Sequence, residues 1–201
     1  PFLEKNGILL VRRVTGGGAV YHDLQNLNYT IVGKSKDLEK DYPGYLHFMV
    51  DALRALGVDA ELSGRNDIMV DGRKCSGYAK RVYKDRLMVH GTLMFDVDLE
   101  VLTNALATPG SKLSAAGIAS VRSRVANLKD YLPGISGIDE FQDRLFRIMS
   151  RDSEGNTDLE TAISPEQEVR IKELADTKFR TWEWIYGRSP AAEFLSKKKF
   201  I

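Results

Sequence analysis

Residues 12–23 combine two cations, a glycine run and an apolar segment. Arg12-Arg13 precede Val14-Thr15 and then Gly16-Gly17-Gly18. Glycine tolerates positive φ and lets a ligand approach main-chain N–H groups. Successive N–H groups form an anion-binding concavity, and an arginine beside them adds bidentate hydrogen bonds to phosphate or carboxylate. The stretch favours binding of a phosphate or a carboxylate; the alternative is a tight connection between strands.

Two common phosphate-binding fingerprints do not match this glycine run. A Walker A loop requires Lys and then Ser or Thr after its last glycine, and the Rossmann fingerprint requires GxGxxG spacing. Neither pattern occurs at Gly16–Gly18. The sequence therefore supports neither a P-loop nor a Rossmann nucleotide site here.

A family resemblance extends beyond this stretch. Residues 12–23, continued by Asn26-Leu27-Asn28-Tyr29, resemble the signature of lipoate–protein ligases, within the wider biotin/lipoate ligase fold family. Further segments resemble that family in the same order: Ser63–Ile68, Gly72–Ala79, His90–Asp96, Ser120–Leu128, and Trp182-Glu183-Trp184 with Gly187 and Pro190. The resemblance covers nearly the whole chain.

The resemblance implies both a fold and a reaction. The fold is α/β (α+β), with a mixed β-sheet flanked by helices, as one catalytic domain over residues 1–201. The reaction uses ATP and Mg²⁺ to convert lipoate to lipoyl-AMP. The lipoyl group then passes to a specific lysine of 2-oxoacid dehydrogenase acyltransferase subunits or of the glycine-cleavage H protein. Family members carry an N-terminal segment and a C-terminal accessory domain, and we expect this chain to lack both.

Lys74 is the leading catalytic candidate. Adenylation of a carboxylate develops charge at an α-phosphate and at a carbonyl, and a fixed ammonium between them stabilises both. The resemblance matches Lys74 to the family's active-site lysine, which contacts ATP and the lipoyl carboxyl or carbonyl. The alternative is a solvated lysine on a hairpin.

The resemblance also implies contacts to each substrate. Those to ATP come from Arg13, Gly18, Ala19, Val20, Tyr21, Asn66, Asp67 and Lys74. Those to lipoate come from Gly16, Gly17, Lys74, Gly77 and His90. Asp67 is also a candidate Mg²⁺ ligand, because one carboxylate plus substrate phosphates commonly holds this ion. The alternative for Asn66-Asp67 is an Asx turn.

Several polar residues keep two interpretations. Arg12 is either a second anion contact or a surface charge. Thr15 either binds phosphate or bonds within the turn. His22 and His90 have no Cys partner at zinc spacing, which favours hydrogen-bonded structural histidines over metal ligands.

Cys75 carries the first alternative function. Related octanoyl and lipoyl transferases need no ATP and use a cysteine nucleophile to form a thioester. On an alternating strand Cys75 faces away from Lys74, and a free cysteine most often behaves as a small buried hydrophobe. The second alternative is a non-catalytic module that binds lipoate or a nucleotide.

The composition indicates one well-packed domain. The chain has 201 residues, of which 43% are hydrophobic and 28% charged, enough for one core and unlike a disordered or fibrous protein. The net charge of +1 provides no global field for nucleic acid or an anionic membrane. One cysteine excludes an internal disulfide, and no apolar run approaches membrane-spanning length. We expect a cytoplasmic protein without nucleic-acid or membrane partners.

The pattern of apolar residues predicts strands around the candidate residues. The expected strands are Leu9–Val14, Ala19–Tyr21, Leu27–Val32, Val58–Leu62, Ile68–Val70 and Arg86–Phe95. Asp71-Gly72 is a two-residue hairpin signal, which places Lys74 on the return strand. Trp182 and Trp184 alternate as on a strand and either cover a pocket or close the core.

Helices are expected where the apolar period changes to 3.6. They are Tyr42–Leu56 with Pro43 in its first turn, Leu99–Leu106 capped by Asp98 and ended by Pro109-Gly110, a helix through Ile138–Met149, and Ser164–Ala175 with a capping box of Ser164 and Gln167. Lys34–Asp41 suits a solvated loop, and Arg151–Thr161 suits a polar loop.

Overall fold

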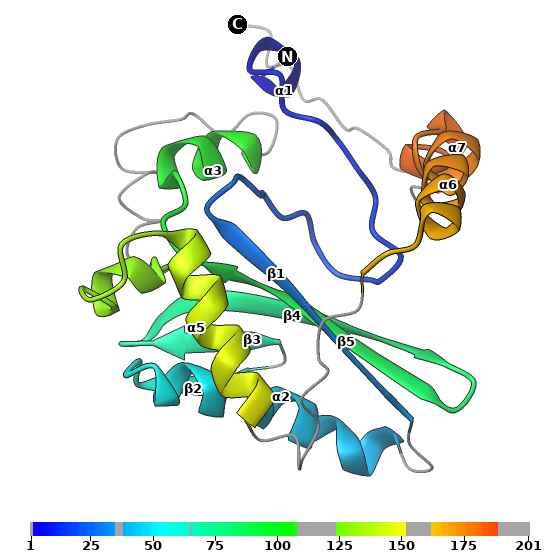
Figure 1. The fold of residues 1–201 in the computed structure, drawn as a ribbon. Helices are drawn as coiled ribbons and strands as arrows, with labels where there is room; N and C mark the ends of the chain where they lie inside the picture. The colour runs from blue at the N-terminus through cyan, green and yellow to red at the C-terminus, as the bar shows by residue number, and fades with distance from the viewer. Residues whose placement is uncertain (1, 35–37, 65, 108–123, 152–161, 189–201) are drawn as a thin grey trace, which may run out of the picture. The chain divides into compact units, whose positions relative to one another are not determined.

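The structure is a computed structural model that describes residues 2–34, 38–64, 66–107, 124–151 and 162–188 (Figure 1). Contacts divide the chain into two compact units. The first contains Leu3–Val14 and the described residues from Ala162 onward, and the second contains the described residues from Thr15 to Arg151. The expectation of one catalytic domain over residues 1–201 stays a prediction.

The second unit is built on a five-stranded sheet. Its strands are β1 (Asn26–Lys34), β2 (Ala60–Ser63), β3 (Asp67–Val70), β4 (Arg73–Tyr83) and β5 (Arg86–Met94). Their order is β1-β5-β4-β3-β2, and each neighbouring pair is antiparallel. A parallel bridge joins Lys74 to Val125. The predicted class, an α/β (α+β) sheet flanked by helices, is confirmed.

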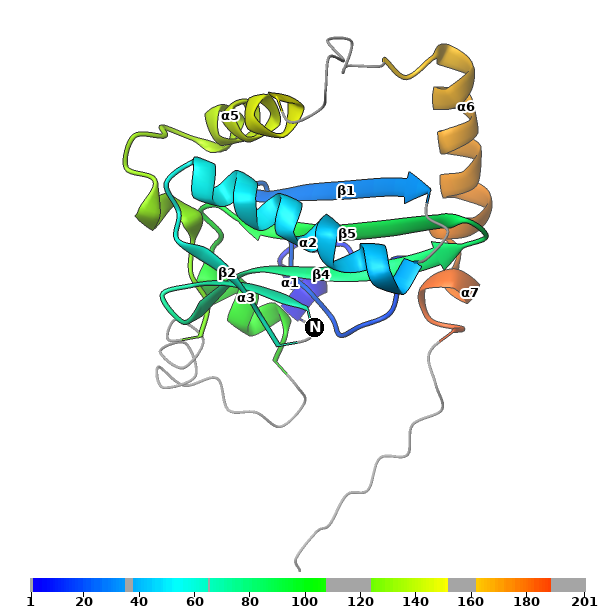
Figure 2. The same ribbon diagram turned by 90° about the horizontal axis from the view of Figure 1, so that it is seen from below.

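One face of the sheet is covered by α2 (Leu38–Ala55) and α5 (Ile138–Arg151). Figure 1 shows α5 lying across the strands, and in Figure 2 it lies on the opposite side of β1 and β5 from α3 (Leu99–Ala105). Both covering helices contribute fully buried side chains, such as Met49 and Phe141, and the facing side of β5 contributes Leu87, Val89 and Leu93. The core of this unit therefore lies between the sheet and these two helices.

The first unit holds α1 (Phe2–Lys5, of which Leu3–Lys5 belong here), α6 (Pro165–Leu174), a π-helical turn η2 (Ala175–Phe179) and α7 (Trp182–Ile185). Trp184 is buried, and its indole Nε1–H donates a hydrogen bond to the Arg12 carbonyl at 2.8 Å. The Arg12 Nε–H donates in turn to the Ile185 carbonyl at 2.9 Å. This pair of bonds ties the segment before the glycine run to the end of α7.

Several local predictions are confirmed. Asp71 and Gly72 have φ of 50° and 68°, as a two-residue turn with positive φ at both positions requires, and Val70 pairs with Arg73 across it. The Asp98 side chain accepts hydrogen bonds from the N–H groups of residues 100 and 101 and so caps α3. Ser164 caps α6 in a capping box with Gln167, as predicted.

The two strands predicted beside the glycine run are wrong. Residues 8–23 contain no strand, and the apolar side chains of the first segment are exposed, Leu9 by 86% and Val11 by 75%. A β-branched, apolar run favours a strand only where a neighbouring strand accepts its hydrogen bonds. Neither segment has such a ladder among the residues that the structure describes.

Three further predictions need correction. The loop assigned to Lys34–Asp41 is wrong in part, since β1 includes Lys34 and α2 begins at Leu38. Charged residues suit the outside of a helix as well as a loop. Pro43 consequently lies inside α2 instead of in its first turn. Trp182 and Trp184 lie on the short helix α7 instead of a strand, with Trp184 buried and Trp182 exposed.

Some predictions fall outside the described residues: the helix stop at Pro109-Gly110, positions 120–123 of the Ser120–Leu128 block, most of the Arg151–Thr161 loop, and Pro190. Among the helices that the structure does describe, none combines the length and the apolar character needed to cross a bilayer.

Candidate functional site

The face of the sheet opposite α2 and α5 carries most of the predicted chemistry. On β5 the buried residues Leu87, Val89 and Leu93 alternate with partly exposed His90 and Thr92, so these two point to the other side. Thr92 pairs with Gly77 on β4, and Gly77 pairs with Asp67 on β3. We call Asp67, Lys74, Gly77, His90 and Thr92 the open face.

A β-bulge brings Lys74 onto the open face. Ile68 pairs with Ser76 while Met69 pairs with Lys74, so Cys75 is an extra residue on β4. Cys75 and Ser76 are both buried. In a regular strand, residues three apart point to opposite faces, and Lys74 would face away from Gly77. The extra residue places both on the same side.

The main chain of Lys74 is held by a segment far away in sequence. Its N–H donates to the Arg124 carbonyl and its carbonyl accepts from the Ala126 N–H, each at 2.9 Å. These bonds form the parallel bridge between Lys74 and Val125. Both polar main-chain groups of Lys74 are therefore hydrogen-bonded outside the β3–β4 ladder, which fixes the base of its side chain.

The side chain of Lys74 lies beside a carboxylate. Its Nζ is 2.6 Å from Oδ1 of Asp67, and the two side chains are 37% and 33% exposed. A charge-assisted contact of this length is strong, and its partial burial reduces solvent screening. The ammonium is thus held at the surface of the open face, where a negatively charged ligand can reach it.

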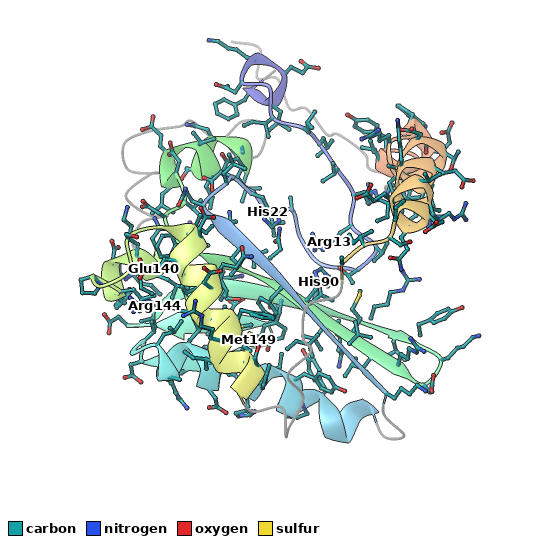
Figure 3. The ribbon with its side chains drawn as sticks, viewed as in Figure 1. Arg13, His22, His90, Glu140, Arg144 and Met149 are labelled. Carbon is teal, nitrogen blue, oxygen red and sulfur yellow. The ribbon has the colours of Figure 1, made fainter. Side chains whose placement is uncertain are left out.

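The glycine run belongs to a loop that is tied down at both ends. At its start, Thr15 Oγ1 is hydrogen-bonded at 2.7 Å to Nε2 of His90, which is labelled in Figure 3. Near its end, the Asp23 Oδ2 accepts the Asp98 N–H at 3.0 Å. An added Cβ at Gly16 or Gly18 would meet nothing within 4 Å, so there is open space beside the loop. A ligand on the open face can approach this part of the loop.

Tyr21 lies near the end of the same loop. Burial raises its pKa, and the nearby carboxylates of Asp23 and Asp98 raise it further. The phenol therefore stays protonated at neutral pH and can act as a hydrogen-bond donor.

Cys75 has the environment of a structural cysteine. Its side chain is fully buried and its Sγ contacts the Ile68 carbonyl at 3.4 Å. Burial raises the pKa of the thiol from 9.0 to about 12. A nucleophilic cysteine needs a thiolate near neutral pH and access to substrate. Cys75 meets neither condition, and it faces away from Lys74 as expected.

The carboxylates of the described residues suit a metal ion only in part. No three His, Cys, Asp or Glu side chains come together to hold a metal within the described ranges. Asp67 offers one carboxylate beside Lys74, which fits Mg²⁺ when substrate phosphates supply the remaining oxygens. Direct ligation by Asp67 stays a prediction.

The structure brings some predicted residues together and separates others. Asp67, Lys74 and Gly77 are neighbours, while His90 is joined to the loop through Thr15. Asn66 lies exposed just before β3, where its carbonyl accepts the Tyr78 N–H at 3.1 Å. Ala19 and Val20 are exposed on the loop.

Arg13 belongs to the first unit. Its contact with ATP stays a prediction. Arg12 donates from its Nε to the carbonyl at the end of α7, and its contact with an anion stays a prediction. The Thr15 hydroxyl is hydrogen-bonded to His90.

Sequence reasoning missed the main-chain support of Lys74. The residues that provide it, Arg124 and Ala126, fall in one of the family-like segments, Ser120–Leu128, but no single position there had a chemical signal. Main-chain hydrogen bonds leave no trace in residue type. The bulge at Cys75 was missed for the same reason.

Comparison with known proteins decides the family. The sequence model of one family, the lipoyl protein ligase A/B catalytic domain, matches residues 1–150, about three quarters of the chain. The chain belongs to this family. Among its relatives, lipoate-protein ligase LplJ of Bacillus subtilis is 41% identical over 201 residues, and lipoate-protein ligase 1 of Staphylococcus aureus is 40% identical over 203. Each alignment covers 99% of this chain, which spans about 60% of the length of these relatives.

Solved structures of lipoyl protein ligases share the fold. A bipartite lipoate protein ligase from Thermoplasma acidophilum, studied with its E2 lipoyl domain, has a TM-score of 0.81 at 34% identity. The superposition covers 95% of this chain and 75% of the ligase chain. A lipoate-protein ligase A bound with ATP has a TM-score of 0.76 at 34% identity, with coverage of 92% and 75%. A further Thermoplasma acidophilum structure, a putative lipoate protein ligase with bound lipoic acid, has a TM-score of 0.72 at 34% identity, also with coverage of 92% and 75%.

Proposed function

We propose that this protein is a lipoate–protein ligase, which activates lipoate with ATP and attaches the lipoyl group to a lysine of an acceptor protein. The observation that carries the proposal is the Lys74 ammonium, held 2.6 Å from Asp67 on the open face. Family membership and relatives named as lipoate-protein ligases support the same reaction.

The first half-reaction forms a mixed anhydride. A carboxylate oxygen of lipoate attacks the α-phosphorus of ATP, the bond from that phosphorus to the bridging oxygen breaks, and pyrophosphate leaves. Negative charge grows on the α-phosphate oxygens, where the Lys74 ammonium stabilises it. The hydrogen bonds from Arg124 and Ala126 keep the lysine main chain in place during this step. When bound, Mg²⁺ would neutralise phosphate charge, with Asp67 as its protein ligand.

The second half-reaction forms the amide. The neutral ε-amine of the acceptor lysine attacks the lipoyl carbonyl, the bond between the acyl carbon and the phosphate oxygen breaks, AMP leaves and the amine loses a proton. The mixed anhydride is already activated, so the protein needs to orient the amine and exclude water. Lys74 can stabilise the developing oxyanion from its position on the open face.

The remaining predicted residues divide between the two substrates. The proposed contacts to ATP come from Arg13, from the loop residues Gly18, Ala19, Val20 and Tyr21, and from Asn66 and Asp67. The proposed contacts to lipoate come from Gly16, Gly17, Gly77 and His90. The Thr15–His90 hydrogen bond supports this division, because it holds the start of the loop, where Gly16 and Gly17 follow Thr15, beside His90.

The acceptors follow from the same proposal. They are the lipoyl domains of 2-oxoacid dehydrogenase acyltransferase subunits and the glycine-cleavage H protein. A similar structure comes from a system that includes an E2 lipoyl domain, which supports an acceptor of this class. We place the reaction in the cytoplasm, since ATP is the proposed co-substrate.

The test is ATP-dependent modification of a purified lipoyl domain, followed by mass spectrometry. We expect the mass increase of one lipoyl amide, which requires lipoate, ATP and Mg²⁺ together and is absent when the acceptor lysine is replaced by arginine. Modification without ATP would contradict the ligase and favour an acyl transferase. Saturable binding of lipoate without any modification would favour a binding module.

A further inference from the structure

The side chain of Lys74 crosses the position of Gly77. A Cβ built on Gly77 would lie 3.1 Å from Cε and 3.1 Å from Nζ of this lysine. Ordinary van der Waals contact begins near 3.4 Å. The end of the lysine side chain thus packs against residue 77 more closely than a side chain at that position would normally allow.

The main chain gives no other reason for glycine at this position. Gly77 has no positive φ, so an L-residue can adopt its conformation. The nearest main-chain atom to the added Cβ is the Asn66 carbonyl oxygen, at an ordinary 3.9 Å. Gly91 differs, because a Cβ there would lie 2.5 Å from the Tyr29 hydroxyl oxygen and 2.8 Å from the Gly77 carbonyl oxygen. A side chain at 91 would therefore meet both a ring and the main chain of β4, whereas the close contacts at 77 are with Lys74 alone.

The geometry of the two strands explains why this space matters. Gly77 pairs directly with Asp67 across the β3–β4 ladder, and the bulge at Cys75 puts Lys74 on the same face. To reach Asp67, the lysine side chain must run over residue 77. A side chain there would lift the ammonium away from the sheet and from its carboxylate partner.

We propose that Gly77 is a positioning residue that sets the location of the Lys74 ammonium by leaving room for its side chain. This inference rests on the proposed function for its catalytic consequence, but not for its structural one. In this role Gly77 acts through Lys74. The role does not require Gly77 itself to contact lipoate.

A graded pair of substitutions tests this role. In Gly77→Ala the lysine must give way by a few tenths of an ångström, and in Gly77→Val the γ-carbons block its path. Valine suits the interior of a strand, so the sheet tolerates it. We expect the kcat of lipoate-dependent pyrophosphate exchange to fall several-fold in the alanine variant and about 100-fold in the valine variant, since misplacement by about 1 Å costs roughly that much.

The division between kcat and KM separates positioning from pocket lining. If Gly77 acts through Lys74, kcat falls, and the KM for lipoate rises no more in Gly77→Val than in Lys74→Ala. A raised KM at constant kcat would overturn the proposal and leave Gly77 as a lipoate contact. Unchanged kinetics in both variants would overturn it as well. Gly134→Val is the matched control, because a Cβ at Gly134 meets nothing within 4 Å.

A double-mutant cycle gives the second kinetic test. On the Lys74→Ala background, Gly77→Val should cause no further loss, because no ammonium remains to be displaced. Equal loss on both backgrounds would overturn the proposal. Should Gly77→Val alone fail to fold, folding of the double variant would support a collision with the lysine, and failure of both would contradict it.

Crystal structures provide a readout that needs no activity. The proposal expects the distance from Lys74 Nζ to Asp67 Oδ1, 2.6 Å in the native chain, to exceed 4 Å in Gly77→Val. An unchanged distance would overturn it. This comparison also separates the two proposals: absence of exchange in the native protein would contradict the ligase function, while the measured distance would still decide the role of Gly77.

Discussion

The ammonium of Lys74 and the carboxylate of Asp67 form an ion pair with an Nζ–Oδ1 distance of 2.6 Å across the β3–β4 ladder. The bulge at Cys75 and the hydrogen bonds to Arg124 and Ala126 fix the lysine main chain beneath it. The lysine is therefore placed before any ligand binds. Such preorganisation avoids the cost of arranging a charge during the reaction.

Removal of the Asp67 charge should weaken adenylation. Asp67→Asn keeps the shape of the side chain but removes the charge that pairs with Lys74, and a partly exposed ion pair contributes about 1 kcal/mol. We expect pyrophosphate exchange to fall about fivefold and to need a higher Mg²⁺ concentration. Asp59→Asn, at an exposed position before β2, is the control. Unaltered exchange and Mg²⁺ dependence would rule out both roles of Asp67.

The strand position of Lys74 was predictable from the sequence, but the contacts that support it were not. Lys74 was correctly placed on the return strand of the Asp71-Gly72 hairpin, because the turn signal is local. The Thr15–His90 hydrogen bond joins residues 75 positions apart, and no local pattern indicates it. Arg124 and Ala126 act through their main chain, which residue type does not reveal.

The Thr15–His90 bond gives a prediction for substrate binding. Thr15→Val keeps the shape of the side chain but removes the hydroxyl, so the start of the loop is no longer hydrogen-bonded to the sheet. A bond of this kind contributes about 1 kcal/mol, and we expect the KM values for ATP and lipoate to rise roughly fivefold. Steady-state exchange kinetics provide the measurement. Thr177→Val, at an exposed position of η2, should match the native protein, and equal effects at both positions would contradict the assignment.

Cys75 should be dispensable for the reaction. Its thiol is buried and its pKa is raised to about 12, so it forms no thiolate at neutral pH. Cys75→Ala should keep acyl transfer within about threefold of the native rate, and incubation with an acyl donor should yield no hydroxylamine-sensitive protein adduct. Loss of transfer together with a trapped native thioester would instead establish the transferase.

The same thiol should make stability decrease at high pH. The folded pKa of Cys75 is about 12 against 9.0 for an unperturbed thiol, so above pH 9 the unfolded chain loses this proton first. The free energy of unfolding then falls by about 1.4 kcal/mol per pH unit for one such group. Between pH 8 and 10.5 the free energy of unfolding, measured in urea, should fall by about 2 kcal/mol more in the native protein than in Cys75→Ala. Parallel losses in the two proteins would contradict this burial effect.

The fold shows where local patterns suffice. The capping residues Asp98 and Ser164 were correctly identified, because a cap acts within three residues of itself. The turn between β4 and β5 was not predicted, since Lys84, with φ of 54°, is a poor turn signal. Leu9–Val14 has the residues of a strand but no ladder among the described residues. Strand formation depends on a partner that the segment itself does not specify.

The most direct measurement is lipoate-dependent exchange of labelled pyrophosphate into ATP in the native protein, Lys74→Ala and Cys75→Ala, with Mg²⁺ present. Exchange reports the first half-reaction alone. We expect exchange that requires lipoate, persists in Cys75→Ala and falls at least about 100-fold in Lys74→Ala, because a fixed stabilising charge is removed. Native-level exchange in Lys74→Ala, or no exchange in the native protein, would contradict it.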